Sequence, residues 1–352
     1  MASLAEHSTT TAETGPDRAV GAWLLACAGM VFVMALLGAI TRLSESGLSI
    51  MEWAPLSGTL PPLSEAEWQR LFALYQEIPE YQEVNRGMGL EEFREIFWLE
   101  YIHRLWGRLI GVVFLLPFLW FWLRRRLRPG LARHLWAIFA LGALQGLMGW
   151  YMVASGFAER TDVSQYRLVA HLLLAVAVYL YTLALALKLL WPVGGGHENR
   201  PLRRGLLALI VLLIVTIASG GFVAGLNAGL IYNTFPLMDG RLVPEAYGSL
   251  NPWAANLFEN HAAVQFNHRL LAIASLAGAL ALWATSRGTR LVPQGRRLLD
   301  LLAAVTALQV ALGIATLLLV VPVWLGALHQ AGALALLSVA VCALHGLKRR
   351  SA

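Results

Sequence analysis

Eight apolar stretches, each about 20 residues long, dominate this sequence of 352 residues. A helix needs about that length of apolar sequence to cross the hydrocarbon core of a bilayer. The mean hydropathy is +0.61 and only 14% of the residues are charged, values that the polar surface of a soluble protein would not give. The sequence therefore predicts an all-α, polytopic membrane protein with eight transmembrane helices. We expect them at residues 20–40, 105–123, 135–157, 168–191, 206–226, 264–285, 298–321 and 324–347.

Charge alternates between the connections that join these stretches. Arginines and lysines gather in the connections on one face of the predicted bundle. The connections on the other face hold 16 of the 21 acidic residues, and 11 of those lie in the long segment 42–100. Because cytoplasmic loops are enriched in Lys and Arg, we expect both termini to be cytoplasmic and the acidic segment to be outside. The net charge of +6 then records topology, and a nucleic-acid ligand is not expected. The basic residues are Arg124, Arg125, Arg126, Arg128 and Arg133; Lys188, Arg200, Arg203 and Arg204; Arg287, Arg290, Arg296 and Arg297; and Lys348, Arg349 and Arg350.

Several features indicate a bacterial inner-membrane protein. The first 19 residues carry three acidic residues and one arginine, unlike an Arg-rich mitochondrial presequence. The first apolar stretch is longer than a typical signal-peptide core and no cleavage site follows it, so we expect it to be retained. The two cysteines, Cys27 and Cys342, lie in apolar stretches near opposite ends of the chain and indicate neither a disulfide framework nor a thiolate metal site.

The outer segment 42–100 contains a helix-start signal. Ser64 and Glu67 have the spacing of a capping box ahead of the apolar residues Trp68 and Leu71. From Leu90 onward the pattern runs helically into the second apolar stretch. Two interpretations stay open: a lid or interfacial helix that gates a substrate, and an amphipathic hairpin that only covers the outer end of the bundle.

An internal repeat divides the chain into two halves. His103-Arg104-Leu105 recurs as His268-Arg269-Leu270 at an offset of 165, and Leu144-Gln145 with Met148-Gly149 recurs as Leu308-Gln309 with Leu312-Gly313 at an offset of 164. Gly47-Leu48 recurs as Gly229-Leu230 at an offset of 182, so the second half has a shorter outer loop. Both halves have the same orientation, which predicts a pseudo-two-fold axis near the membrane normal. The expected parts are a tail at 1–19, repeats at 20–191 and 206–347, a linker at 192–205 and a tail at 348–352.

Four of the nine histidines occupy matching positions, at the outer ends of the even-numbered stretches. They are His103, His171, His268 and His329. A single histidine there would be read as interfacial and hydrogen-bonded to water or a carbonyl, but ionisable residues within spans are rare and by default functional. Two histidines per four-helix unit, on different helices at similar depth, suit ligation of a flat metal cofactor from both faces. With no nearby thiolates or paired carboxylates, bis-histidine haem is favoured over zinc or di-iron.

Three arginines and the depth of the histidines refine this prediction. Arg104, Arg167 and Arg269 lie at the same outer level, where they could bind haem propionates through bidentate hydrogen bonds; ordinary interfacial snorkelling is the alternative. All four histidines lie on the outer side, which argues against a simple relay of electrons across the bilayer. Two sites side by side suggest instead that one haem supplies redox equivalents while the other is the substrate.

The two halves differ at one position near the histidines. Glu100 lies three residues before His103 and shares its helical face, whereas the equivalent residue before His268 is Gln265. A carboxylate could transfer protons or orient an intermediate during oxidation. An amide does not titrate and so cannot transfer protons in this way. A favourable interaction with the helix dipole is the simpler alternative.

These residues together resemble the haem A synthase family, in its proteobacterial and mitochondrial branch. The resemblance rests on the eight spans, the duplicated histidine pairs, Glu100-Tyr101-Ile102-His103-Arg104, and residues 38–50 followed by Trp53. It implies oxidation of the C8 methyl group of haem O to the formyl group of haem A, for assembly of terminal oxidases. It further implies that His103, His171 and Glu100 serve the substrate haem, and that His268 and His329 hold a haem b cofactor.

The resemblance also sets expectations about partners. Haem O and the enzyme that produces it would be partners, with an electron donor of unknown identity, the lipid bilayer and a possible homo-oligomer. Some family members carry a cysteine pair in the first outer loop, but residues 42–100 contain none, which puts a disulfide-based mechanism in doubt. Two alternatives are a non-catalytic protein that holds or delivers haem and a quinol-linked dihaem cytochrome.

Overall fold

The computed structural model describes residues 15–54, 57–157, 160–191 and 199–347. Within these ranges the regular structure is helical, and eight helices are long and apolar enough to cross a membrane. The prediction of an all-α protein with eight spans is therefore confirmed, and the chain is a multi-pass membrane protein. The spanning helices are α1 (Gly15–Leu43), α3 (Leu90–Leu123), α4 (Leu131–Val153), α5 (Gln165–Leu190), α6 (Arg200–Gly225), α8 (His261–Arg287), α9 (Pro293–Leu318) and α10 (Val323–Gly346).

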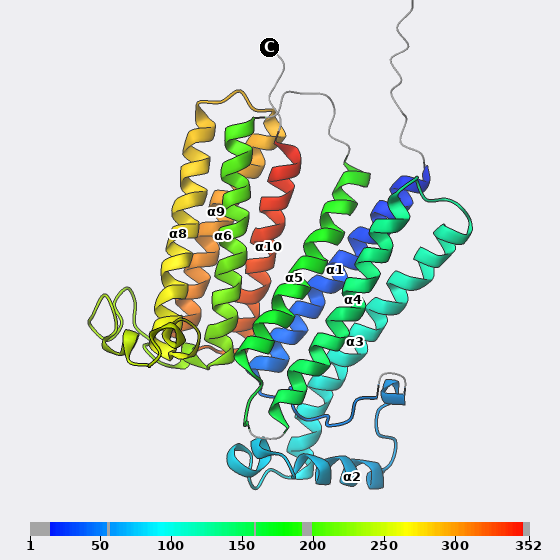
Figure 1. The fold of residues 1–352 in the computed structure, drawn as a ribbon, viewed down its shortest axis with the longest axis vertical. Coiled ribbons are helices and arrows are strands. Elements are labelled where there is room, and N and C mark those ends of the chain that lie inside the picture. Colours follow the sequence, from blue (N-terminus) through cyan, green and yellow to red (C-terminus); the bar gives the residue numbers. More distant parts are fainter. Residues whose placement is uncertain (1–14, 55–56, 158–159, 192–198, 348–352) are drawn as a thin grey trace, which may run out of the picture.

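The helices form two groups that stand side by side, α1 with α3, α4 and α5, and α6 with α8, α9 and α10 (Figure 1). Within the groups, α1 packs on α3 as α6 packs on α8, and α4 packs on α5 as α9 packs on α10. The halves meet where α1 contacts α10 and where α5 contacts α6, two contacts that interchange when the halves are exchanged, and where α5 contacts α10 directly. The tandem arrangement of the two repeats and the axis near the membrane normal stay predictions.

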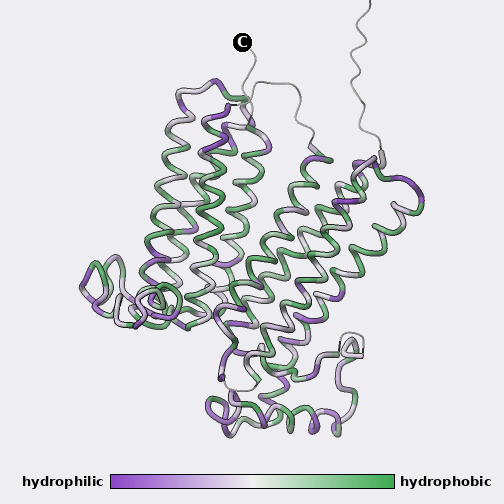
Figure 2. The backbone as a smooth tube through the Cα atoms, viewed as in Figure 1, coloured by the Kyte–Doolittle hydropathy of each residue, from purple (hydrophilic) through white to green (hydrophobic). Residues whose placement is uncertain are grey.

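Apolar side chains fill the contact between the two halves. One buried cluster joins Val176 and Leu183 of α5 to Leu206 of α6 and Leu337 of α10. Hydrophobic residues run along the middle of the spans and hydrophilic ones gather toward the ends (Figure 2). Across the same contact the hydroxyls of Tyr179 and Ser338 lie 2.7 Å apart and share a hydrogen bond, which satisfies two polar groups in an apolar environment.

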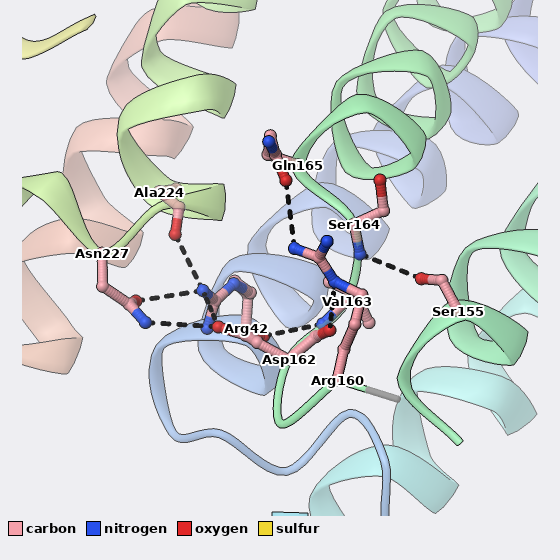
Figure 3. A network of polar contacts seen from close by, with 9 residues as sticks. All are labelled: Arg42, Ser155, Arg160, Asp162, Val163, Ser164, Gln165, Ala224 and Asn227. Atoms are coloured by element: carbon pink, nitrogen blue, oxygen red, sulfur yellow. Dashed lines mark hydrogen bonds and ion pairs between the residues drawn. The ribbon is translucent and has the colours of Figure 1, made fainter. Parts of the chain in front are cut away.

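A polar network ties the halves together at their outer ends (Figure 3). Arg42, in the last turn of α1, pairs with Asp162 at 2.7 Å and donates to the carbonyl of Ala224 in α6 at 2.8 Å. Asn227, just after α6, accepts from Arg42 at 3.0 Å and donates to Asp162 at 3.2 Å. Because the Arg42 side chain is only 13% exposed, this ion pair is partly shielded from solvent and stronger than a surface pair.

The helices begin before the apolar stretches expected for them, and two begin inside the expected tail or linker. α1 begins at Gly15, inside the expected tail 1–19, and α6 begins at Arg200, inside the expected linker 192–205. Asn199 caps α6 by accepting from the Leu202 N–H, and Pro201 follows at the start of the helix, a position that suits proline. Helices extend past the hydrocarbon core with polar turns that a hydropathy pattern does not mark. Residues 1–14, 192–198 and 348–352 lie outside the described ranges.

The outer segment packs on the extended start of α3. Its helix α2 (Glu65–Tyr75) is capped by Ser64, whose side chain accepts from the Glu67 N–H at 3.3 Å, as the spacing predicted. The Glu67 side chain instead pairs with Arg70. Trp68 and Tyr75 of α2 pack with Phe93 and Phe97 of α3 in a buried aromatic cluster. The cluster holds α2 against α3.

A buried carboxyl group makes this outer segment sensitive to pH. Glu80 is 5% exposed and accepts a hydrogen bond from the Tyr75 hydroxyl at 3.2 Å. Burial raises the pKa of Glu80 from 4.5 to about 8, and the nearby carboxylates of Asp162, Glu100 and Glu45 raise it further against the opposing effect of Tyr75. The folded segment therefore binds a proton more tightly than the unfolded chain. Its stabilising effect is full below about pH 4.5 and is lost as the pH rises to about 8.

We expect Glu80→Gln to remove this pH dependence. The neutral amide keeps an acceptor for Tyr75 and has no charge to desolvate. The wild-type segment should lose up to about 1.4 kcal/mol of local stability per pH unit in this window, and the variant should lose much less. Hydrogen exchange of residues 65–97 between pH 5 and 8 measures the difference. Glu83→Gln, at an exposed position of the same turn, is the control, and parallel profiles for wild type and Glu80→Gln would contradict the assignment.

Candidate haem-binding site

The four candidate histidines lie on four different helices, two in each half. His171, His268 and His329 each follow the start of their helix by about two turns, in α5, α8 and α10. His103 lies farther along α3, because α3 begins in the outer segment. All four imidazoles are half-buried. The structure thus places the side chains at the outer ends of the spans, two per half.

The structure brings the second-half pair together. The ring centroids of His268 and His329 lie 6.4 Å apart and their planes are nearly perpendicular, at 89°. Two metal–nitrogen bonds of about 2 Å each, together with the radii of two imidazole rings, account for such a separation. In the described residues, the side-chain hydrogen bonds of His268 and His329 are made through Nδ1. The donor set therefore fits a metal ion held between two neutral imidazoles.

The first-half histidines lie on the equivalent helices, His103 on α3 and His171 on α5. Among the described residues, the Nδ1 atom of His103 is buried and makes no hydrogen bond of ordinary geometry. Gln145 Nε2 lies 3.1 Å from Nδ1 and 3.3 Å from Nε2 of His171, and the ligation of a haem by His103 and His171 stays a prediction.

Neighbouring polar side chains orient three of the four rings. Gln145 donates to Nδ1 of His171 at 3.1 Å, and Gln309 donates to Nδ1 of His329 at 3.0 Å. Each amide also donates to the backbone carbonyl of the histidine that it contacts. The Ser219 hydroxyl lies 2.8 Å from Nδ1 of His268. Contacts of this kind fix ring orientation around a metal.

In the sequence, Gln145 and Gln309 served only to align the two halves of the repeat, and their contacts with the histidines were not predicted. Leu144-Gln145 and Leu308-Gln309 recur at matching positions, and a polar residue repeated within apolar spans is itself a sign of function. Ser219 has no such signal, because the equivalent residue of the first half is Leu37.

Glu100 forms the centre of a buried ion pair beside His103. It is 3% exposed and accepts from Arg104 Nη2 at 2.6 Å and Nε at 3.0 Å. Its other oxygen accepts from the Ser49 hydroxyl at 2.7 Å and from the Ile50 N–H at 2.8 Å. Arg104 also donates to the carbonyls of Ile50 and Glu52. The pair therefore fixes the outer loop that follows α1 against α3.

The second half repeats this arrangement with an amide in place of the acid. Gln265 accepts from Arg269 Nη2 at 2.8 Å and donates to the carbonyls of Ala228 and Ile231. Arg269 donates to two further loop carbonyls, those of Tyr232 and Thr234. In the first half, the loop after α1 offers hydrogen-bond donors to Glu100. In the second half, the loop after α6 offers hydrogen-bond acceptors to Gln265. The predicted asymmetry between the halves is therefore built into the backbone as well as the side chain.

The three arginines that we expected at propionates have protein partners. Arg104 and Arg269 bind loop carbonyls as described, and Arg167 donates to the Tyr151 carbonyl at 2.7 Å and lies over the Tyr151 ring. Within the described ranges, Nε of Arg269 is buried and makes no hydrogen bond. The propionate role of these residues stays a prediction.

The choice of a haem over a metal ion bound by protein alone stays a prediction from the sequence. Among the residues that the structure describes, no three His, Cys, Asp or Glu side chains converge on one point, as zinc or di-iron centres require. Paired imidazoles alone supply two axial ligands, which is the protein share of a bis-histidine haem.

Comparison with known proteins identifies relatives along almost the whole chain. The Heme A synthase of Rhodospirillum centenum is 54% identical over 345 residues, which cover 95% of this chain and 91% of the relative. That of Granulibacter bethesdensis is 50% identical, covering 97% and 92%, and that of Nitrosospira multiformis is 49% identical, covering 95% of both. A model of the COX15-CtaA family, described as cytochrome oxidase assembly protein, matches residues 21–341. The chain therefore belongs to the COX15-CtaA family of cytochrome oxidase assembly proteins.

Proposed function

We propose that this protein is a haem A synthase, a membrane-bound oxidoreductase that oxidises the C8 methyl group of haem O to the formyl group of haem A. The observation that carries the proposal is the close pair of imidazoles in the second half, repeated in the first half by histidines on the equivalent helices with the buried Glu100 near His103. Relatives named Heme A synthase, about half identical over nearly the whole chain, support it.

The two sites have different tasks in this proposal. His103 and His171 hold the substrate haem O, and Glu100 serves as the acid or base beside it. His268 and His329 hold a haem b cofactor, which would supply redox equivalents when bound. The Ser219 hydrogen bond to His268 and the lack of an equivalent for His103 fit a resident cofactor in the second half and an exchangeable haem in the first.

The proposal also places the protein in the cell. We infer a bacterial inner-membrane location with both termini cytoplasmic, from the basic connections. The four histidines then lie near the periplasmic side. The substrate is membrane-soluble, so the enzyme that produces haem O is a natural partner, and the electron donor and a homo-oligomeric state belong to the same proposal.

Purified protein tests the proposal directly. We expect haem extracted from the resting protein to be haem B with smaller amounts of haem O or haem A, identified by chromatography and mass spectrometry. Membranes that contain the protein and a source of haem O should accumulate haem A. Bound haem without any conversion would instead favour a haem-delivery protein, and rapid reduction of both haems by a quinol would favour a quinol-linked cytochrome.

A further inference from the structure

Each of the four candidate haem ligands rests against a glycine of a neighbouring helix. In every case the imidazole Cε1 is the atom nearest to the place where a Cβ would stand on that glycine. The separations are 3.1 Å for Gly38 and His103, 3.1 Å for Gly149 and His171, 3.0 Å for Gly220 and His268, and 2.8 Å for Gly313 and His329. A methyl group at any of these positions would press on the ring.

The four glycines follow the internal repeat. Gly38 in α1 and Gly220 in α6 differ by 182, the offset of the neighbouring Gly47 and Gly229, and Gly149 in α4 and Gly313 in α9 differ by 164. Both members of each pair therefore kept the same contact after the duplication. Glycine inside a helix costs about 1 kcal/mol relative to alanine, so another requirement has to hold it there.

Close helix packing is the simpler explanation of a glycine in a membrane span. It accounts for Gly21 and Gly205, where a Cβ would meet aliphatic atoms of Leu190 and Leu282 on neighbouring helices. The four glycines at issue face an imidazole edge instead. Cε1 lies between the two ring nitrogens. Its contact with the glycine therefore limits rotation of the imidazole ring about the Cβ–Cγ bond.

From this contact, we propose that Gly38, Gly149, Gly220 and Gly313 are positioning residues that set the ring orientation of the four axial ligands. The inference rests on the proposed haem function. Polar groups on the same helices complete the arrangement for three rings, since Ser219 directly precedes Gly220 while Gln145 and Gln309 precede Gly149 and Gly313 by one helical turn. The glycine limits the ring on one edge and the polar group holds Nδ1.

Alanine substitutions test the proposal through the spectrum of the bound haem. In Gly220→Ala and Gly313→Ala the added methyl should tilt His268 or His329 and weaken an axial bond. We expect a change in the low-spin electron paramagnetic resonance signal of the haem b, and haem lost at least tenfold faster on dilution into apomyoglobin. Gly38→Ala and Gly149→Ala should leave that signal unchanged and lower the binding of added haem O.

Other glycines of the same helices supply matched controls. A Cβ on Gly29 of α1 or Gly146 of α4 meets nothing within 4 Å, so alanine there should be neutral. Gly205→Ala is the control for crowding. Its Cβ would lie 2.6 Å from Leu282 Cδ2, and none of the four histidines is among the atoms nearest to it. It should lower thermal stability without altering the haem signal.

The outcomes separate the inference from the function that it rests on. If the wild-type protein shows no bis-histidine haem signal, the proposed function fails. If the wild type shows that signal and Gly220→Ala and Gly313→Ala leave it unchanged, the positioning role alone is wrong. An identical spectral change in Gly205→Ala would also overturn it, since general crowding would then suffice.

Discussion

Alanine in place of His268 or His329 is expected to strip the proposed haem b from the purified protein, whereas alanine in place of His103 or His171 is expected to leave it bound. The ring centroids of His268 and His329 are 6.4 Å apart, so each imidazole could supply one axial bond to the proposed haem. Loss of an axial ligand should weaken haem binding by more than about 100-fold, since even partners outside the ligand set contribute 10- to 100-fold in metal sites. Haem B per protein, measured by the pyridine haemochrome spectrum, reports the loss.

A histidine away from both sites supplies the control. His134 lies in the first turn of α4, where its Nδ1 shares a hydrogen bond with the Tyr181 hydroxyl at 2.7 Å. His134→Ala should retain haem fully. Equal loss of haem B from the variants of both halves would contradict the division into a cofactor site and a substrate site, and retention in all four would contradict ligation.

The helices were predictable from the sequence because the bilayer imposes a length and a composition on each span. What hydropathy missed were polar turns, such as the start of α1 at Gly15, that continue a helix beyond the apolar core. The pairing of His268 with His329 was also predictable, because the repeat fixed both the helix and the depth of each residue. Their separation depends on how α8 packs on α9 and α9 on α10, which no local pattern encodes.

The surroundings of Glu100 show the limit of reasoning from position alone. Glu100 and Arg104 are one helical turn apart, a spacing that favours an ion pair, so their contact was readable from the sequence. The hydrogen bonds from Ser49 and Ile50 were not, because they join residues about fifty positions apart through a loop of irregular backbone. These contacts raise a question that the sequence could not: whether Glu100 acts on a substrate or only holds the loop.

Glu100→Gln is expected to reduce the conversion of haem O to haem A by at least about 100-fold while the resident haem stays bound, since an acid or base in the reacting position contributes 10²- to 10⁴-fold. The substitution also has a structural cost. The new amide would present a donor to the Ile50 N–H, and leaving that buried N–H without an acceptor costs about 1–3 kcal/mol. Lost activity by itself therefore does not distinguish the two roles.

Ser49→Ala separates the chemical role of Glu100 from its structural role. This variant removes one hydrogen bond to the carboxylate and loosens the same loop, but it keeps the acid and its pairing with Arg104. We expect Ser49→Ala to retain activity within several-fold of wild type, and proteolysis of the loop at 44–63 should show comparable loosening in both variants. If Ser49→Ala lost as much activity as Glu100→Gln at equal loosening, Glu100 would be a residue that holds the loop. Full activity in Glu100→Gln would remove it from both roles, because neither its charge nor its loop contacts would then be needed.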